Sequence, residues 1–351
     1  MSARVGVIGT GWADRVLIPA FQAGGVDVAA VASRDPARAR SIADRHGVAS
    51  ATGSWRDLLD MDVDVVVVTS APAYHVEQVT AVLASGRHVL CEKPLGVDVA
   101  SAEAIAAAAR GASGRLALVD HELRFTPARR KARELIRSGA IGRVVTVTAR
   151  VANRMRVDPT RPWTWWSDVA QGGGILGALG CHVLDSVRWL LDGEIDLRGA
   201  SLGRVYPTRL DADGVERTVT AEDIASLTFK VGDVVGTALL HGAALDDAID
   251  LFTVRGTEGS LVIDRSLKLY FGKRGGPLKE YLTPLPAIVP NRFRASGFAA
   301  GSVLFAEALG RALGGDAAAL EGAADVEDGL AVQRAIDRAR RLDAAPPAPG
   351  S

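Results

Sequence analysis

Short apolar runs alternate with helix-compatible segments through the first third of the chain. The pattern predicts strands at residues 5–8, 26–32, 63–68 and 88–91, and helices at 12–24 and 74–85. Strands that alternate with helices favour a parallel, doubly wound sheet. The unbroken valine run 65–68 predicts a strand that is covered on both faces.

From Arg143 onward the pattern changes to alternating apolar and polar positions. It predicts strands at residues 144–151, 225–231, 234–242, 250–256 and 260–264. This alternation indicates an α+β region with a large, mostly antiparallel sheet. With helices on one face, the other face of such a sheet stays open. Because an open apolar face is commonly buried by another subunit, we expect a homodimer or homotetramer.

Composition narrows the class of protein. The 351 residues are enough for two domains, and 41 basic residues balance 41 acidic ones, which leaves no excess charge to attract a nucleic acid. No apolar run approaches the roughly 20 residues that span a bilayer, and no signal-like stretch precedes the first strand, so we expect a cytoplasmic protein without a membrane partner. Cys91 and Cys181 lack metal-type spacing, so neither a metal site nor a disulfide framework is predicted.

A glycine turn follows the first predicted strand. Glycine permits a tight turn and close backbone approach, and the helix start after it offers amide donors and a positive dipole end to a pyrophosphate. Such turns also occur for geometry alone, but the strand–helix–strand context favours a dinucleotide site with contacts from Gly9, Thr10, Gly11, Trp12 and Ala13. Asp14 stands where the fingerprint usually has Gly or Ala. We expect its carboxylate to point away or to pair, for example with Arg15.

The end of the second strand bears on the choice of cofactor. A fold that selects NAD normally has an acid there, about 20 residues after the glycines. Here Ser33 can donate to a 2′-phosphate, and Arg34 can lie over the adenine or pair with that phosphate. Asp35 could serve the ribose of NAD, although its place before Pro36 also fits a helix N-cap. NADP is therefore the preferred cofactor and NAD the alternative.

Polar residues also follow the next two predicted strands. Thr69 and Ser70 follow one, and Glu92 and Lys93 follow the other. Because ligands bind beyond the carboxyl ends of parallel strands, these residues are expected on the ligand edge of the sheet. A surface ion pair at a turn is the simpler explanation of Glu92 and Lys93, and Pro94 then serves only to stop the strand.

Five segments together resemble the Gfo/Idh/MocA oxidoreductase family over nearly the whole chain. They are VGVIGTGWADRVLIPAF, TSAPAYH, CEKPL, GGGILGALGCHVLDSVRWLL and EDGLAVQRAIDRARR. The resemblance implies a Rossmann domain over 1–120 and a substrate-binding and oligomerisation domain over 121–343. Residues 344–351 lack apolar periodicity, which predicts a disordered tail. It adds Pro72 and His75 to the expected cofactor contacts.

The resemblance also implies the catalytic pair. Lys93 would contact the nicotinamide ribose and the reacting hydroxyl, and His182 would move the proton. A helix over 175–191 places Leu176, Leu179, Gly180, Val183, Val187 and Leu190 on one face, and Ala178, His182, Asp185 and Trp189 on the other. Many members carry an aspartate where this chain has Ala178, so its substrate positioning differs from that of inositol or glucose dehydrogenases.

Further residues are candidate substrate contacts. His121 and Arg124 lie where the chain leaves the Rossmann half, and pairing at a domain junction explains them equally well. Trp163, Trp165 and Trp166 precede the glycine-rich turn and would stack on a sugar or nicotinamide, or else seal a core. Asp185 shares the predicted helix face of His182.

These expectations combine into one leading hypothesis. The protein would be an NAD(P)-dependent dehydrogenase or reductase that transfers a hydride between nicotinamide and a secondary alcohol or ketone of a small polar ring, such as a sugar or cyclitol. The alternatives are a non-catalytic nucleotide-binding regulator and a redox-cycling NAD-dependent lyase or glycosidase.

Overall fold

The computed structural model describes residues 3–245 and 251–344, and the chain divides into two compact units. The first unit lies within Met1–Gly96, Ala100–Pro127 and Pro284–Leu330, and the second within Val97–Val99, Ala128–Thr283 and Ala331–Ser351. The predicted tail lies outside the described residues except for Ala344, which ends the last helix.

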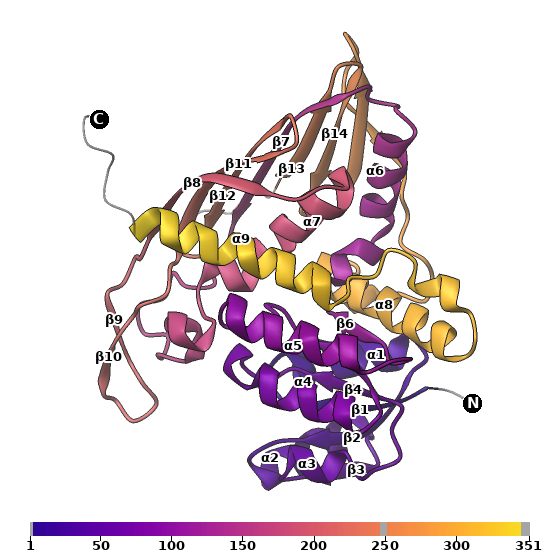
Figure 1. Cartoon of the computed structure of the whole chain (residues 1–351), viewed down its shortest axis with the longest axis vertical. Helices are drawn as coiled ribbons and strands as arrows, with labels where there is room; N and C mark the ends of the chain where they lie inside the picture. Colours follow the sequence, from indigo (N-terminus) through magenta and orange to yellow (C-terminus); the bar gives the residue numbers. More distant parts are fainter. Residues whose placement is uncertain (1–2, 246–250, 345–351) are drawn as a thin grey trace. The chain divides into compact units, whose positions relative to one another are not determined.

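The first unit is built on a six-stranded parallel sheet with the order β3-β2-β1-β4-β5-β6 (Figure 1). The strands are β1 (Arg4–Ile8), β2 (Asp27–Ala32), β3 (Ser50–Thr52), β4 (Val65–Val68), β5 (His88–Cys91) and β6 (Ala117–Val119). This order is that of the Rossmann fold, so the predicted doubly wound sheet is confirmed. All four valines of β4 are at most 1% exposed, as expected for a strand covered on both faces.

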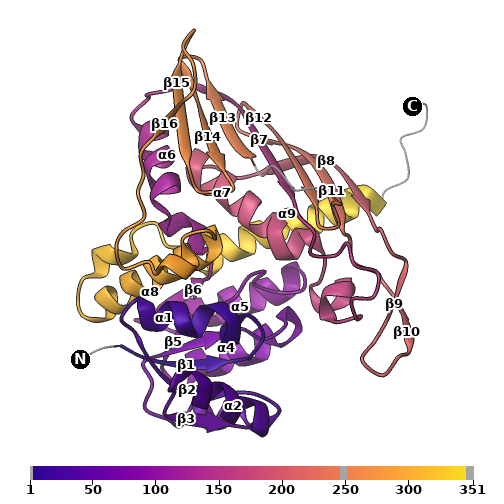
Figure 2. The ribbon, with the colours of Figure 1, turned by 180° about the vertical axis from the view of Figure 1, so that it is seen from behind.

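Helices connect these strands and complete the first unit. They are η1 (Ala13–Leu17), α1 (Ile18–Ala23), α2 (Pro36–His46), α3 (Trp55–Leu58), η2 (Pro72–Tyr74), α4 (His75–Ala84), α5 (Val99–Gly111), η3 (Glu122–Phe125), η7 (Asn291–Phe293), α8 (Gly297–Leu313) and η8 (Ala317–Leu320). Figures 1 and 2 show α8 beside α1 in opposite views. The contact is close because Gly24, at the end of α1, has no side chain: a Cβ there would lie 2.7 Å from the Cβ of Ala306.

The second unit is built on an eight-stranded sheet with the order β16-β15-β14-β13-β7-β12-β11-β8. Its strands are β7 (Val144–Ala152), β8 (Asp196–Gly203), β11 (Ile224–Val231), β12 (Val234–His241), β13 (Leu251–Gly256), β14 (Gly259–Asp264), β15 (Leu269–Lys273) and β16 (Lys279–Tyr281). All neighbouring pairs are antiparallel except β7 with β12. The predicted mostly antiparallel sheet is therefore confirmed, and β9 (Thr208–Leu210) and β10 (Glu216–Thr218) form a separate hairpin.

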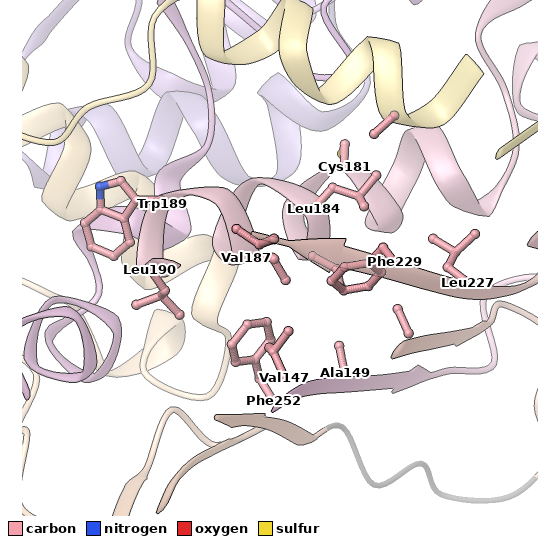
Figure 3. Close-up of a cluster of buried hydrophobic side chains, with 14 of the residues drawn as sticks. Val147, Ala149, Cys181, Leu184, Val187, Trp189, Leu190, Leu227, Phe229 and Phe252 are labelled. Carbon is pink, nitrogen blue, oxygen red and sulfur yellow. The ribbon is translucent and has the colours of Figure 1, made fainter. Parts of the chain in front are cut away.

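Helices cover one face of this sheet and enclose the core of the second unit. They are α6 (Pro127–Arg137), η6 (Leu176–Gly180), α7 (Cys181–Leu191) and α9 (Val326–Ala344), and the short η4 (Trp165–Ser167) and η5 (Val169–Gln171) lie in the loop before η6. Figure 3 shows side chains of α7, among them Leu184 and Val187, directed toward Val147 and Phe229 of the sheet. Along β11 and β12 every second residue is buried, so the alternate side chains form the outer face.

The predicted two-faced helix over 175–191 is only partly right. Its first turn, η6, is a π-helix, and α7 begins after it at Cys181. A π-turn holds more residues than an α-turn, so a single 100° periodicity does not run through both segments. Trp189, which was assigned to the ligand face, is 7% exposed and packs in the core (Figure 3), where the guanidinium of Arg133 lies 4.5 Å from its ring centroid.

The same helical region is long and apolar enough to span a membrane, contrary to the expectation from the sequence that no apolar run approaches that length. The stretch Val169–Leu191 has a mean hydropathy of 1.2 over an 18-residue window, within the range of a membrane helix. However, 83% of that window is buried inside the protein. Burial against other protein segments is typical of a core helix, and the leucines and valines of α7 account for the hydropathy.

Candidate active site

The glycine turn after β1 has the geometry of a dinucleotide-binding loop. Gly9 has a φ of +105°, and a Cβ on it would lie 2.6 Å from Oγ1 of Thr69 at the end of β4. Glycine is therefore required here both for the backbone conformation and for the approach of β4. A Cβ on Gly11 would meet no atom within 4 Å, so the far side of the turn is open to a ligand. These two glycines fit a bound pyrophosphate beside the helix that starts at Ala13.

Asp14 does pair, but not with Arg15. Its carboxylate accepts hydrogen bonds from Nη1 of Arg45 at 2.7 Å and from Nε2 of His46 at 2.9 Å. Burial by itself would raise the pKa of Asp14, but the hydrogen bonds from His46 and Arg45 outweigh it and lower the pKa. These partners stand at the end of α2, and sequence reasoning missed them. They neutralise a charge that would otherwise oppose a pyrophosphate.

Three polar side chains, those of Ser33, Arg34 and Asp35, follow the end of β2. Arg34 is exposed, lies over the ring of Tyr74 at 5.3 Å and donates to its hydroxyl at 3.2 Å. Asp35 caps α2, because its Oδ1 accepts from the amides of Ala37 and Arg38 at 3.0 and 3.2 Å. The N-cap explanation of Asp35 is thus confirmed, and Ser33 precedes it at the strand end.

Arg38 is a candidate cofactor residue that the sequence analysis missed. Its Nε donates to Oγ1 of Thr10 at 2.9 Å, so the exposed guanidinium lies at the glycine turn. Asp35 is the N-cap of α2, and Arg38 lies about one turn after it. This spacing could have indicated from the sequence that Arg38 shares the side of the helix start that faces the glycine turn. Together with Arg34 it makes this end of the first unit cationic.

The loop after β4 is fixed to the loop after β5 by a buried histidine. His75 is fully buried, and its Nε2 lies 3.0 Å from the carbonyl oxygen of Ser70, while its Nδ1 lies 3.2 Å from that of Leu95. Burial lowers the pKa of His75. The ring thus lies between the two loops rather than in the open part of the turn, whereas the Ser70 hydroxyl donates to Gln78 at 2.6 Å. Pro72, in η2, is buried.

Glu92 and Lys93 follow β5 at the same sheet edge as the glycine turn, as predicted. The Lys93 amide donates to Oε2 of Glu92 at 3.2 Å, and the Lys93–Pro94 peptide bond is cis. Asp120 follows β6 next to them, and its amide donates to the Cys91 carbonyl at 2.8 Å. Burial raises the pKa of Glu92, and burial together with the charges of Glu122 and Glu92 raises the pKa of Asp120 well above its usual range. The sequence analysis named His121 as a candidate substrate contact and did not include Asp120.

His121 and Arg124 are both buried within the first unit. Arg124 donates from Nη1 to Oδ2 of Asp328 at 2.9 Å and to the carbonyl oxygen of Gly322 at 3.3 Å. An ion pair between the buried guanidinium and the partly exposed carboxylate of Asp328 is the packing explanation of Arg124, and a substrate role for it stays a prediction. His121 is 2% exposed at the start of η3.

In the second unit, His182 and Asp185 lie one turn apart on α7 and are 3% and 1% exposed. Ala178 precedes His182 by four residues in η6. The helix therefore carries an imidazole and a carboxyl, but no acid where the family commonly has one.

The glycine turn before this helix is held by a clamp that the sequence analysis did not find. Nη2 of Arg340, in α9, donates to the Gly173 carbonyl at 2.7 Å and to Oε1 of Glu222 at 3.1 Å. The same oxygen accepts from the Leu176 amide at 3.2 Å. Gly174 has a φ of +97°, and a Cβ there would lie 2.3 Å from Oε1 of Glu222. The clamp thus sets the start of the helix that carries His182.

The tryptophan-rich loop leads into this turn, and none of its three indoles is fully buried. Nε1 of Trp163 donates to the Thr218 carbonyl at 2.9 Å, which fixes that ring to β10. The rings of Trp165 and Trp166 lie 6.0 Å apart and tilted by 40°. The buried Arg209 holds the loop, since its guanidinium donates to carbonyl oxygens of residues 156, 158 and 161. Trp165 and Trp166 stay candidate substrate contacts.

Comparison with known proteins agrees with this geometry. The oxidoreductase family with an NAD-binding Rossmann fold matches residues 3–121, and the GFO/IDH/MocA C-terminal domain matches residues 129–262. The chain belongs to the Gfo/Idh/MocA family of oxidoreductases. Among the described residues, the Gfo/Idh/MocA chain has no group of three His, Cys, Asp or Glu side chains that could hold a metal ion.

Three relatives illustrate the match. The chain is 31% identical over 262 residues to a 1,5-anhydro-D-fructose reductase of Ensifer adhaerens, with 74% of this chain and 75% of the relative covered. It is 28% identical over 296 residues to a levoglucosan dehydrogenase of Pseudarthrobacter phenanthrenivorans, with 74% and 75% covered. The crystal structure of an NAD-binding oxidoreductase from Klebsiella pneumoniae has a TM-score of 0.85 and 27% identity, with 98% and 97% covered.

Proposed function

We propose that this NAD(P)-dependent oxidoreductase is an NADP-preferring dehydrogenase or reductase of a sugar, a cyclitol or a related polar ring. One observation carries the proposal: Lys93 lies at the same sheet edge as the glycine turn, with Glu92 beside it. Bound NADP would supply or accept the hydride. Lys93 holds the reacting oxygen of the substrate by hydrogen bonding, and Glu92 orients Lys93.

His182 is the proposed proton carrier. An imidazole can take the hydroxyl proton during oxidation and return it during reduction near neutral pH. Asp185, one turn further along α7, and the indoles of Trp165 and Trp166 would position the ring. Ala178 removes the carboxylate that commonly grips a neighbouring hydroxyl in the family, so the substrate is held by other groups.

The cofactor preference follows from the end of β2. Arg34 and Arg38 provide two guanidinium groups and Ser33 a hydroxyl, and each can bind a 2′-phosphate. The carboxylate of Asp35 is engaged as a helix N-cap. A ribose hydroxyl of NAD would find fewer partners there than the phosphate of NADP.

The substrate class is supported by the relatives, whose names specify a levoglucosan dehydrogenase and a 1,5-anhydro-D-fructose reductase. Both substrates are polar six-membered rings, which an aromatic pair with nearby polar groups can bind. A screen of sugars, cyclitols and keto-sugars with NADP and NAD, followed by the absorbance of the reduced nicotinamide, tests this class.

The variant Lys93→Met tests the catalytic assignment. Turnover should fall by at least about a thousandfold, which corresponds to about 4 kcal/mol of transition-state stabilisation, while NADP still binds. Lys273→Met is a matched control on β15 in the second unit and should keep full turnover. Retained turnover in Lys93→Met would refute the catalytic role of Lys93, and absence of turnover in the native protein with bound NADP would favour a regulator.

The outer face of the large sheet is the proposed homo-oligomer interface. Thr228, Thr237, Thr148, Thr253 and Val262 occupy paired positions across five neighbouring strands of that face. β-branched side chains in such a row suit a flat contact with a second copy. A dimer or tetramer should be seen by light scattering, and Thr148→Lys should shift it toward the monomer.

The location proposed for the enzyme is the cytoplasm. Cys91 and Cys181 are both buried and are not joined in a disulfide, as expected where thiols stay reduced. Fractionation of cells that contain the tagged protein tests this location.

A further inference from the structure

Two carboxyl groups lie next to each other at the ligand edge of the first unit. Cys91 at the end of β5 pairs with Val119 at the end of β6, so Glu92 and Asp120 are the first residues beyond the paired strands. The side chains are buried, since Glu92 is 8% exposed and Asp120 1%. Such deep burial is unusual for two neighbouring carboxyl groups, because each can carry a negative charge.

The Asp120 carboxyl has no well-directed hydrogen bond to satisfy it. Neither of its oxygens has a partner of good geometry among the described residues, although the carboxyl lies close enough to that of Glu92 to interact with it. Two buried carboxylates so close together cannot both be ionised, because each disfavours the charge of the other. One proton between them removes the repulsion and supplies the missing hydrogen bond.

Other charged groups act on the pair. Lys93 favours its ionised form, and Glu122 at the start of η3 opposes it. Cys91 stays neutral, because burial and the charges of Glu92 and Asp120 raise the pKa of its thiol well above the usual range. Beyond β6, the carboxylate of Asp325 is engaged with the amides of residues 327 and 328 at the start of α9.

We propose that Glu92 and Asp120 share one proton in the free enzyme, and that binding of the oxidised cofactor releases this proton to solvent while binding of the reduced cofactor does not. The inference rests on the proposed function, which places the nicotinamide at Lys93. The oxidised ring carries a positive charge that the reduced ring lacks, and this charge favours ionisation of the pair. Once a hydride has neutralised the ring, the pair takes up a proton again.

Linkage fixes the sign of the effect. If oxidised cofactor releases a proton on binding, its affinity rises with pH until the free pair loses the proton by itself. NADP+ and NADPH carry the same 2′-phosphate, so the ratio of their affinities cancels any ionisation at that end. The affinity ratio therefore reports the charge on the ring.

The experiment measures dissociation constants of NADP+ and NADPH from about pH 6 to about pH 9, for the native enzyme and for Asp120→Asn. The native ratio of affinities, NADP+ over NADPH, should rise with pH and approach about tenfold per pH unit. In Asp120→Asn the ratio should be flat. The variant Asp44→Asn, at an exposed site on α2, should keep the native slope.

Calorimetry of the native enzyme in two buffers of different ionisation enthalpy counts the released protons directly, so the inference does not depend on the folding of a variant. Release of a fraction of a proton or more with NADP+, and less with NADPH, supports it. A flat native ratio with firm binding of both forms would overturn the inference alone, as would an unchanged slope in Asp120→Asn. Failure of the native protein to bind either form would overturn the proposed function and the inference together.

Discussion

Replacing Arg38 by alanine separates recognition of NADP from recognition of NAD. The guanidinium is held at the glycine turn because its Nε donates to Oγ1 of Thr10 at 2.9 Å and its Nη2 to the Thr10 carbonyl oxygen at 3.5 Å, and Nη1 is the nitrogen proposed to bind a 2′-phosphate. A hydrogen bond to a charged group contributes about 1.5–3 kcal/mol, and 1.4 kcal/mol corresponds to a tenfold change in affinity. We therefore expect Arg38→Ala to bind NADP about 10- to 100-fold more weakly.

The control is the binding of NAD by the same variant, which should change by less than about threefold because NAD has no 2′-phosphate. Arg40→Ala is matched in chemistry on the same helix, where Arg40 bonds Asp44, and should bind both cofactors as the native protein does. Titration of the cofactors followed by intrinsic tryptophan fluorescence measures all three proteins. Equal losses for NADP and NAD in Arg38→Ala would contradict the assignment of this residue to the phosphate.

Three further predictions concern residues that support the glycine turn after β1 and the helix that carries His182. Glu222→Gln should lower the free energy of unfolding by about 2–4 kcal/mol, because it leaves Arg340 without its buried partner; urea denaturation measures this, and equal loss when Arg340 is already Met would argue against the clamp. Gly9→Ala should abolish cofactor binding, whereas Gly25→Ala, with positive φ but open space, should cost only about 1 kcal/mol of stability. Asp14→Asn should lower stability at neutral pH by about 1 kcal/mol, and the difference should vanish as the pH falls below the ordinary carboxyl range, since the native pKa is lowered; a difference that persists in acid would refute this.

Local patterns predicted four of the six strands of the parallel sheet in the first unit. The strand over 88–91 begins and ends where expected, and the valine run of β4 is buried throughout. Both depend on neighbours in the sequence, because alternation with helices and uninterrupted apolar runs are properties of a few consecutive residues. The motif at Glu92 and Lys93 could be placed at the ligand edge for the same reason.

Local patterns failed where a contact joins distant parts of the chain. The partners of Asp14 stand 31 and 32 residues away, and those of Glu222 include an arginine 118 residues away. The faces of the helix over 175–191 were misassigned in part because a π-turn interrupts its period. No spacing rule finds such features, since they depend on which elements the fold brings together.

The amino-acid sequence by itself determined the alternation of elements, the glycine turn, the lysine after β5 and the histidine on its helix, because each is written in adjacent residues. Only the tertiary structure decided which charged side chains lie next to them. The strand order places Asp120 beside Glu92, α2 brings cations to Asp14, and α9 brings Arg340 to Glu222. The physical reason is that burial and electrostatic interaction depend on distance in space, whereas periodicity depends on distance along the chain.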